Sequence, residues 1–520
     1  MPPISPGKVA LPPPRPHRVV PLALDVLAEQ IGAELLGTRR ATVVGATLRA
    51  NQVQPGDLFA ALPGSRVHGA DFASAAAASG ASAVLTDADG RARLEGAGLE
   101  LPLLVHPSPR AVLGAASARI YGDPSARLAV LGITGTSGKT TASYMVHSAL
   151  LAAGRNTGLI GTIETRVSGV RMPSSFTTPE APDLQALFAV MLEEGVTQAV
   201  MEVSSHALAL GRVGGTAFRV GAFTNLSQDH LDFHPTMEDY FAAKAQLFDG
   251  RSATEVVCID DGWGERLVGQ DTVTVSSNPQ RPATWRAGKV EVHADASQTF
   301  LALGPEGVRL PITVRLPGTF NIANALLATA ILHAYGIEGE AIAQGLASAS
   351  VPGRMQRVDA GQDFTAVVDY SHKPAAVAEA LDALRDQLVR SGEQGRIIVV
   401  LGCGGDRDTA KRPLMGEAAA RRAEVLVVTD DNPRSEDPAA IRASMLAGAL
   451  AVAAPQRGDV IEAADRRSAI EEAVRRARPG DVVLVAGKGH ETGQDIDGVV
   501  HPFSDSDELE AAIRCRQVSR

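Results

Sequence analysis

The feature that most constrains this chain is a glycine-rich segment that follows a short apolar run. The run is Leu128–Ile133, and the chain continues Thr-Gly-Thr-Ser-Gly-Lys-Thr-Thr up to Thr141. This pattern predicts a buried strand over 128–133, then a loop, and then a helix over 139–153. Glycines in such a loop leave room for backbone N–H groups to converge on an anion, and the helix N-terminus adds its positive dipole end. The segment therefore predicts a phosphate site for a nucleotide.

Within this loop the residue types suggest roles. Lys139 can reach the outer phosphates of a nucleotide, and the Thr140 hydroxyl can ligate Mg²⁺. The strict pattern has glycine five residues before Gly138, where this chain has Ile133, so the segment is a variant P-loop. An ordinary strand–turn–helix is the alternative. The expected nucleotide contacts are Gly132, Thr134, Gly135, Thr136, Ser137, Gly138, Lys139, Thr140 and Thr141.

Length and composition exclude several classes of protein. A chain of 520 residues is too long for one core, so about three domains are expected. A net charge of −10 without a basic block argues against a nucleic-acid partner. The three scattered cysteines fit a reducing compartment. The N-terminus has no apolar signal region and no apolar run approaches about 18 residues, so we expect a cytoplasmic protein without membrane insertion.

Alternating helix and strand patterns predict an α/β fold of three domains. The central one has a P-loop and a parallel or mixed sheet, with an antiparallel pattern over 290–316. A small N-terminal α/β domain, opening with helical spacing over 21–36, and a C-terminal Rossmann-like α/β domain flank it. The expected boundaries are 1–20 for a disordered Pro-rich tail, 21–124, 125–350 and 351–520.

Two strand ends should lie beside the P-loop, because ligands of parallel sheets bind outside the carboxyl ends of the strands. One strand ends in Met201-Glu-Val-Ser-Ser-His206 and the next in Asn225-Leu-Ser-Gln-Asp-His-Leu-Asp232. Glu202 is a hard oxygen donor suited to Mg²⁺, and His230 could bind a second Mg²⁺, although histidine is a less usual ligand for so hard an ion. Lys244 follows in an apolar helix, where a snorkelling surface lysine is the plain interpretation.

Together these stretches resemble the Mur ligase family, ATP-dependent amino-acid ligases of peptidoglycan precursor synthesis and hence of cell-wall biogenesis. Further motifs resemble the members that add the third residue of the stem peptide. They are Thr177-Thr-Pro179, Pro352-Gly-Arg-Met355, Val368-Asp-Tyr-Ser-His-Lys-Pro374, Gly402-Cys-Gly-Gly-Asp-Arg-Asp408, Asp431-Asn-Pro-Arg434 and Gly487-Lys-Gly-His-Glu491. The resemblance spans residues 22 to 510.

The resemblance implies roles around ATP and Mg²⁺. Lys139, His230 and Lys244 would be catalytic, with Lys244 carbamylated by CO₂ to become an anionic oxygen donor. A lysine in apolar surroundings loses its proton more easily, which favours this modification. Asn321, Arg354 and Asp369 would contact the nucleotide, so that closure of the third domain assembles the site. The metal ligands would be Thr140, Glu202, His230 and carbamylated Lys244.

The resemblance also implies a UDP-N-acetylmuramoyl-L-Ala-D-Glu substrate. Arg212 suits a carboxylate or phosphate because its guanidinium can donate two parallel hydrogen bonds. Leu48 stands where many relatives have serine, and Phe176 and Leu210 also depart from relatives. The implied contacts are Leu48, Ser65, Thr177, Thr178, Ser204 and Arg212.

The incoming amino acid is expected to be meso-diaminopimelate, which carries a second carboxylate at its far end. Arg434 and Arg407 offer guanidinium groups for carboxylates, whereas Glu491 and Asp431 accept from ammonium. A buried guanidinium without a partner would be costly in a lysine pocket. Without the family, the Asp-Asn-Pro-Arg run would equally suit a polar turn. The implied contacts are Arg407, Asp431, Asn432, Pro433, Arg434, Gly487 and Glu491.

The expected reaction activates the D-glutamate carboxylate as an acyl phosphate, which the amine of the amino acid then attacks. An L-lysine-adding member of the family is the closest alternative. MurF, MurC or folylpolyglutamate synthetase share the core, but the Asp431 and Gly487 motifs argue against them. A non-catalytic P-loop nucleotide switch is the alternative of another class; the acids and histidines at two strand ends argue against it. We expect a monomer.

Overall fold

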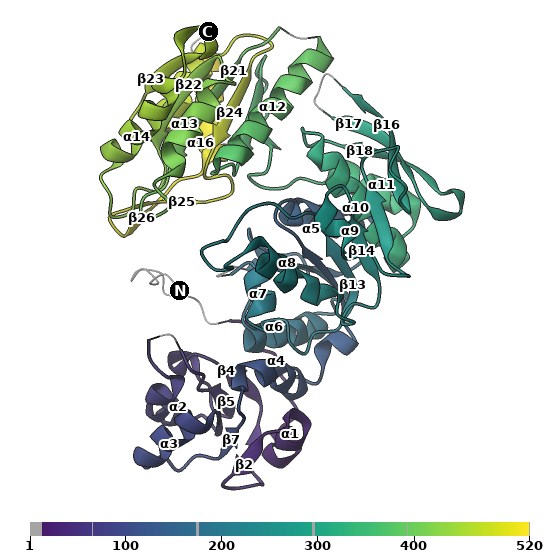
Figure 1. The fold of residues 1–520 in the computed structure, drawn as a ribbon, viewed down its shortest axis with the longest axis vertical. Helices are drawn as coiled ribbons and strands as arrows, with labels where there is room; N and C mark the ends of the chain where they lie inside the picture. The colour runs from purple at the N-terminus through teal and green to yellow at the C-terminus, as the bar shows by residue number, and fades with distance from the viewer. Residues whose placement is uncertain (1–12, 65, 173–175, 294–296, 393, 519–520) are drawn as a thin grey trace.

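A computed structural model of the chain describes residues 13–64, 66–172, 176–293, 297–392 and 394–518. Within these residues, three large sheets follow one another along the chain, with five, eleven and six strands. Figure 1 shows the first unit in purple at one end, the central unit in teal, and the third unit in green and yellow at the other end. The predicted α/β class with a mixed central sheet is confirmed.

The first unit has a sheet with the strand order β2-β7-β6-β5-β4. The helix expected over 21–36 is shorter, because Gly32 adopts a φ of 67° and ends α1 after Ile31. The chain then turns into β2, which pairs with β7 in antiparallel register. The elements are α1 (Leu24–Ile31), β2 (Glu34–Leu36), β4 (Gly45–Thr47), β5 (Asp57–Ala60), α2 (Ala73–Ala78), β6 (Ala83–Thr86), α3 (Ala88–Gly96), β7 (Leu103–Val105) and α4 (Pro109–Ile120).

The central sheet places β8 (Ala129–Thr134) between β12 (Gln198–Glu202) and β13 (Phe218–Phe223), all parallel. Both edges are antiparallel, and the pattern predicted over 290–316 is confirmed by β17 and β18. The other strands are β9 (Thr157–Ile160), β10 (Thr165–Val167), β11 (Val170–Met172), β14 (Glu255–Cys258), β15 (Val273–Ser276), β16 (Trp285–Val292), β17 (Gln298–Leu303) and β18 (Arg309–Val314). The helices are α5 (Lys139–Ala152), α6 (Ala181–Glu193), α7 (Ser205–Ala209), α8 (Met237–Ala245), α9 (Gly262–Glu265), α10 (Phe320–Tyr335) and α11 (Gly339–Ser348).

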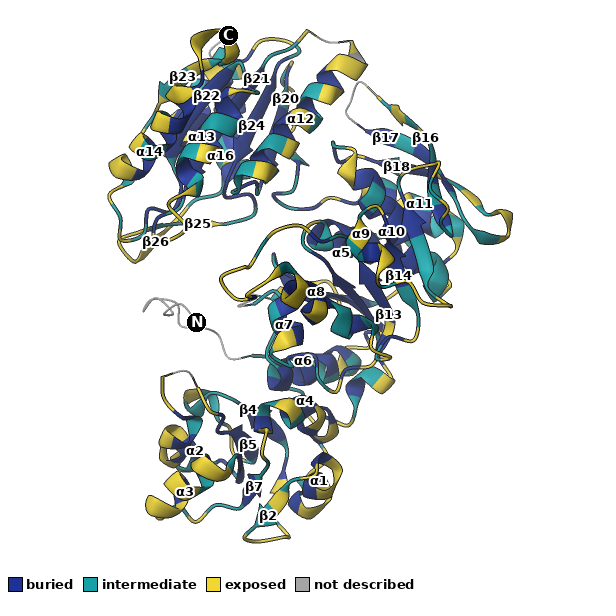
Figure 2. Ribbon diagram, viewed as in Figure 1, coloured by how far each residue is buried: buried dark blue, intermediate teal, exposed yellow. Residues whose placement is uncertain are grey.

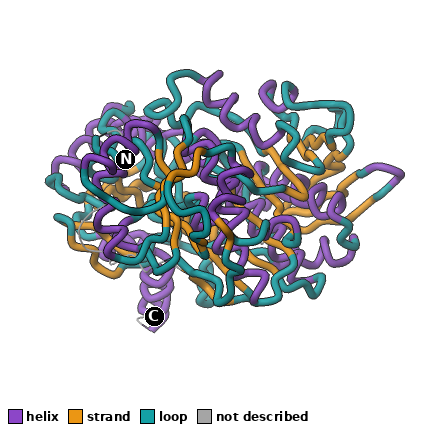
Figure 3. Tube along the Cα trace, turned by 90° about the horizontal axis from the view of Figure 1, so that it is seen from below, coloured by secondary structure: helices purple, strands orange, loops and turns teal. Residues whose placement is uncertain are grey.

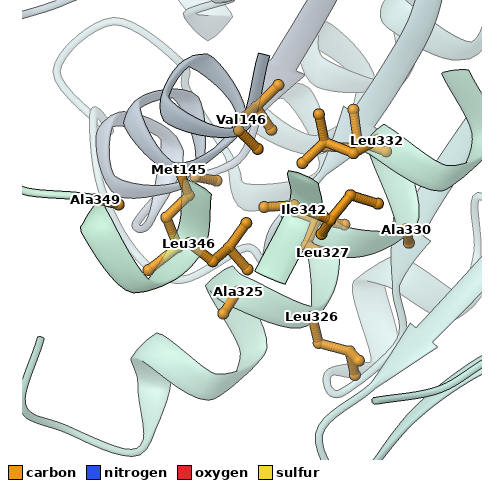
Figure 4. Close-up of a cluster of buried hydrophobic side chains, with 14 of the residues drawn as sticks. Met145, Val146, Ala325, Leu326, Leu327, Ala330, Leu332, Ile342, Leu346 and Ala349 are labelled. Atoms are coloured by element: carbon orange, nitrogen blue, oxygen red, sulfur yellow. The ribbon is translucent and has the colours of Figure 1, made fainter. Parts of the chain in front are cut away.

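Aliphatic packing fixes the helix that leaves the P-loop. Met145 and Val146 of α5 meet Leu327 of α10 and Ile342 and Leu346 of α11 in one buried cluster (Figure 4). Burying one such side chain contributes about 1.5–3 kcal/mol. Aromatic residues make up only 4% of the chain, so small aliphatic side chains do most of this packing.

The third unit has a sheet with the order β19-β20-β24-β21-β22-β23, parallel except for β19. Helices cover both faces of this sheet, whose inner strands β20, β24, β21 and β22 are almost entirely buried (Figure 2). Figure 3 shows helices and strands intermixed along the whole molecule when it is seen from below. Within the described ranges, no helix is both long and apolar enough to cross a membrane. The elements are β19 (Gln356–Arg357), β20 (Thr365–Asp369), α12 (Pro374–Ser391), β21 (Ile397–Cys403), α13 (Lys411–Ala420), β22 (Val425–Asp430), α14 (Pro438–Ala451), β23 (Asp459–Glu462), α15 (Arg466–Arg476), β24 (Val482–Ala486), β25 (Gly493–Ile496), β26 (Val499–Pro502) and α16 (Asp505–Val518).

Candidate active site

The glycine-rich loop joins the end of β8 to the start of α5, as the sequence predicts. Gly135 and Gly138 have φ values of 144° and 85°, which side chains rarely allow. A Cβ on Gly135 would lie 1.8 Å from Thr224 Oγ1, and one on Gly138 would lie 2.3 Å from Asn324 Oδ1. Glycine is therefore required at both positions by conformation and by space. The resulting backbone cradle at a helix N-terminus fits a phosphate group.

The end of β13 holds this loop in place. The Ser137 N–H donates to Asn225 Oδ1 over 3.0 Å, and Thr224 Oγ1 donates to the Ser137 carbonyl over 2.7 Å. The Thr136 N–H donates to the Asn225 carbonyl over 2.8 Å. The strand that ends in the predicted Asn225–Asp232 motif thus fixes the loop conformation before any ligand binds.

Lys139 lies across the loop. Its Nζ donates to the carbonyls of Gly135 and Thr136, both over 2.9 Å. Burial lowers the pKa of Lys139, while the charges of Glu202 and Asp229 act in the opposite direction. The ammonium is therefore already placed over the cradle where the phosphates of a nucleotide would lie.

Glu202 and Thr140, two predicted metal ligands, are in direct contact. Thr140 Oγ1 donates to Glu202 Oε2 over 2.9 Å, and the Thr162 N–H donates to Glu202 Oε1 over 2.8 Å. Among the described residues, no three His, Cys, Asp or Glu side chains gather in a way that could hold a metal ion. This arrangement fits Mg²⁺, which proteins commonly bind through one or two carboxylates plus substrate phosphates.

Lys244 is buried, so the interpretation as a surface lysine is wrong. Its side chain is about 1% exposed, its Nζ donates to the Gly135 carbonyl over 2.7 Å, and it lies 4.5 Å above the Tyr240 ring. Burial lowers its pKa well below the ordinary value, and the charge of Lys139 lowers it further. A neutral amine in this position is chemically suited to react with CO₂.

His230 lies in the loop after β13, near Tyr240. Its φ is 53°, and its ring lies 4.9 Å from that of His206 and 6.1 Å from that of Tyr240. Partial burial lowers the pKa of His230 to about 4, which leaves the imidazole neutral and able to act as a ligand. His206 in turn packs against Phe233, with ring centroids 4.1 Å apart.

One ion pair joins the third unit to this side of the central unit. Asp229, next to His230, forms an ion pair with Lys373 of the third unit. Asp369 is buried and accepts from the N–H groups of Met355 and Ser371 over 2.7 and 2.9 Å. The Asp229–Lys373 pair joins the start of the third unit to the loop after β13 of the central unit, whereas the Asp369 bonds hold the third unit's own loops in place.

The other two predicted nucleotide contacts lie at this junction. The Arg354 guanidinium is 4.4 Å from the Tyr370 ring centroid. Asn321, at the start of α10, donates to the Pro317 carbonyl over 2.7 Å and accepts from Asn324 over 3.1 Å. Since Asn324 is the side chain that limits space at Gly138, Asn321 is coupled to the P-loop.

Four residues expected at the muramoyl peptide gather beside Glu202. Thr178 Oγ1 donates to the Glu202 carbonyl over 2.8 Å and accepts from the Ser204 N–H over 3.1 Å. Thr177 contacts Thr162 through their hydroxyls over 3.0 Å. Arg212 Nη1 donates to the Thr178 carbonyl over 3.3 Å. A substrate carboxyl bound here would therefore lie next to the predicted metal and phosphate site.

Leu48 and Ser65 are the two remaining residues that we expected to contact the muramoyl peptide. Leu48 is half-buried and packs against the apolar core of the first unit, so its side chain contributes packing there. Ser65 lies outside the described residues.

Most of the predicted amino-acid contacts lie together in the third unit, where an amino-acid pocket is expected. Asn432 Nδ2 donates to Glu491 Oε2 over 2.8 Å, and Arg434 Nη1 donates to the Gly405 carbonyl over 2.6 Å. Gly487 has a φ of 115°, and a Cβ there would lie 3.3 Å from Asp431 Oδ2. Asp431, Asn432 and Pro433 are buried, Arg434 and Glu491 partly so, and Arg407 is exposed on the segment that follows β21.

Sequence reasoning missed two residues that support this pocket. Lys488 is fully buried, and its Nζ lies 3.0 Å from Asn432 Oδ1. Arg466 is also fully buried; it forms two 2.7 Å hydrogen bonds to Asp505 and donates to the Ala486 carbonyl over 2.9 Å. Lys488 lies inside a recognised motif, which was a usable signal. Nothing in the sequence distinguishes Arg466 from the other arginines of α15.

Three family models match consecutive segments of the chain. They are the "Mur ligase family, catalytic domain" over residues 42–121, the "Mur ligase middle domain" over 133–332, and the "Mur ligase, glutamate ligase domain" over 353–489.

Individual relatives match almost the whole chain. A UDP-N-acetylmuramoyl-L-alanyl-D-glutamate–2,6-diaminopimelate ligase of Corynebacterium glutamicum is 51% identical over 495 residues, covering 94% of each chain. A protein of the same name from Streptomyces coelicolor is 52% identical over 510 residues, covering 97% of this chain and 99% of that one. A solved structure of a ligase with this name superposes with a TM-score of 0.70 at 29% identity, covering 96% of this chain and 100% of that one. The chain belongs to the Mur ligase family.

Proposed function

We propose that this protein is a MurE-type ligase, which uses ATP to join meso-diaminopimelate to the D-glutamate of UDP-N-acetylmuramoyl-L-Ala-D-Glu. The observation that carries this function is the identity of 51% and 52%, over nearly full length, with two ligases of that name. In this proposal residues 21–124 bind the uridine nucleotide, 125–350 bind ATP, and 351–520 bind the amino acid. A reaction that consumes ATP and a UDP-linked precursor belongs in the cytoplasm.

In the first step, an oxygen of the D-glutamate γ-carboxylate attacks the γ-phosphorus of ATP. The bond from that phosphorus to the β–γ bridging oxygen breaks, giving an acyl phosphate and ADP. Lys139 and the N–H groups of the loop stabilise the negative charge that develops on the transferring phosphoryl group. Thr177, Thr178, Ser204 and Arg212 hold the peptide beside that loop.

In the second step, the neutral amine of the amino acid attacks the acyl carbon. The new C–N bond forms, the bond from that carbon to the phosphate oxygen breaks, and the proton lost by the nitrogen ends on the departing phosphate. Attack requires the amine to lie close to the acyl group in the correct orientation. Holding it there in advance removes a large part of the activation barrier. Contact between the third unit and the central unit at Lys373 and Asp229 supports such an arrangement.

Mg²⁺ would be held by Thr140 and Glu202, and His230 and carbamylated Lys244 would face a second ion. These ions would supply positive charge against the phosphates. Lys244 acquires the carbamate when its neutral amine bonds to the carbon of CO₂ and releases one proton. Its burial and lowered pKa support this modification.

The preference for meso-diaminopimelate over L-lysine follows from the charges of the pocket. Arg434 and Arg407 suit the far carboxylate of meso-diaminopimelate, whereas Glu491 and Asp431 accept from its ammonium. L-Lysine would leave the guanidinium groups without a carboxylate.

The test is a coupled assay of the purified full-length protein with ATP, Mg²⁺ and the muramoyl dipeptide. We expect ADP and phosphate release only when an amino acid is added, and much higher kcat/KM with meso-diaminopimelate than with L-lysine. Equal or higher kcat/KM with L-lysine would refute the amino-acid assignment. ATP hydrolysis that does not depend on either substrate would instead favour a nucleotide switch.

A further inference from the structure

Lys488 is the fully buried lysine of the third unit, and it has no place in the mechanism above. Its Nζ lies 3.0 Å from Asn432 Oδ1, 3.3 Å from Glu491 Oε2 and 3.5 Å from Asp431 Oδ1. All three partners belong to the expected amino-acid pocket. Their oxygens belong to the segments that follow β22 and β24, and Lys488 touches all three.

The hydrogen-bond pattern fixes how the Asn432 amide is oriented. Its Oδ1 accepts from Lys488 and from the Asp495 N–H over 2.9 Å, and its Nδ2 donates to Glu491 over 2.8 Å. An amide whose oxygen receives two donors cannot be flipped without losing both bonds. Glu491 is held by the same two neighbours, Lys488 and Asn432.

The positive charge of Lys488 also reduces the repulsion between neighbouring carboxylates. Asp431 and Glu491 are two carboxylates in one small region, and their mutual repulsion would separate them. The buried guanidinium of Arg466, which is paired with Asp505, adds positive charge near both carboxylates. Lys488 is the cation in direct contact with the two of them, and it reduces their mutual repulsion.

We propose that Lys488 is a positioning residue for amino-acid recognition: it orders Asn432, Glu491 and Asp431 so that they can bind the far end of the incoming amino acid. The inference rests on the proposed function, because the substrate of this pocket is taken from it. Lys488 acts through its neighbours, since its own Nζ is enclosed by them.

The test compares steady-state kinetics of the wild type and Lys488→Met, which keeps the length of the side chain and removes its charge. We expect the KM for meso-diaminopimelate to rise about tenfold or more, because buried polar groups lose their partner. The KM values for ATP and for the muramoyl dipeptide should stay within about twofold of the wild type, because the P-loop residues are not touched. The control is Lys289→Met, at a lysine whose side chain is 83% exposed, which should change none of the three constants.

A double-mutant cycle separates positioning from a general loss of stability. In a Glu491→Gln background, Lys488→Met should raise the KM for meso-diaminopimelate by less than about threefold, because one of its main partners is already altered. Additive effects, an unchanged KM, or equal increases in all three KM values would each overturn the inference. If Lys488→Met does not fold, Lys488→Gln, which keeps a donor, is measured in the same way and judged by the same criteria. A wild type that shows no ligation of meso-diaminopimelate would refute the proposed function instead.

Discussion

The central unit and the third unit each bury a lysine near residues that follow the ends of sheet strands. The two lysines differ in the charge of their surroundings. Lys244 of the central unit lies against a carbonyl, an aromatic ring and a second lysine, Lys139. Lys488 of the third unit lies against two carboxylates and an amide oxygen. Both side chains are 1% exposed or less.

The contrast shows that burial alone does not decide what a lysine does. An unpaired ammonium in a low-dielectric interior is costly, so burial lowers the pKa of Lys244 and makes its neutral, nucleophilic form more accessible. A buried lysine in contact with carboxylates and an amide oxygen instead orders those partners. The central unit thus contains a lysine prepared for reaction, and the third unit contains one that acts through its ion pairs.

The largest expected effect comes from Lys139, whose positive charge lowers the pKa of Lys244. Lys139→Ala should lower kcat for ligation by about a thousandfold, because a group that stabilises charge on the transferring phosphoryl is removed. The measurement is phosphate release with both substrates at saturation. Ligation within about tenfold of the wild type would contradict the placement of this lysine at the phosphates.

Lys244 provides the direct test of the contrast. Lys244→Ala should lower kcat about a hundredfold, and added short-chain carboxylates should restore part of it, because they replace the oxygens of the carbamate. The matched control is Lys488→Met, which the same carboxylates should not restore. Mass spectrometry of the native protein should also show an addition of CO₂ at Lys244. Full activity of Lys244→Ala would show that the carbamate is not used.

Buried His147 tests whether burial also lowers the pKa of a second basic residue type. Burial lowers the pKa of His147 to about 4, so this group is neutral when folded and protonates near its ordinary pKa when unfolded. The unfolded state then binds more protons between about pH 6.5 and 4, and stability falls as pH falls through that window. From pH 7 to 5, the wild type should lose up to about 2 kcal/mol more than His147→Gln, measured by urea unfolding. Equal losses would show that His147 does not contribute.

The smallest expected effect concerns the partly exposed ion pair between Asp229 and Lys373. Lys373 is 42% exposed, so the pair contributes at most about 1 kcal/mol. Lys373→Ala should raise the KM for ATP by no more than about fivefold, and added salt should reduce the difference between wild type and variant. A much larger effect that does not depend on salt would mean that Lys373 touches the nucleotide itself.

The sequence predicts the P-loop well because a phosphate cradle depends on consecutive backbone conformations. Gly135 and Gly138 adopt left-handed values that only a few residue types tolerate, and this requirement is visible in the sequence. The strand ends with Glu202 and His230 were also predictable, since parallel strands end at the same edge of a sheet.

Burial was the property that the sequence did not reveal. Without the family resemblance Lys244 would be read as a surface residue, because nothing local shows that α8 turns that side chain under the P-loop. Lys488 and the Arg466–Asp505 pair depend on segments far apart in the chain. The predicted helix over 21–36 was too long because Gly32 ends it, a signal that was present but was not used.

The Arg466–Asp505 pair has a consequence for the order in which the protein matures. Asp505 begins α16, and Arg466 joins it to the ends of β22 and β24, from which the amino-acid pocket is built. A ribosome therefore finishes every pocket residue before it makes the helix that steadies them. A nascent or truncated chain that ends before residue 505 would hold the nucleotide loop in place, yet would lack a rigid frame for selecting its amino acid.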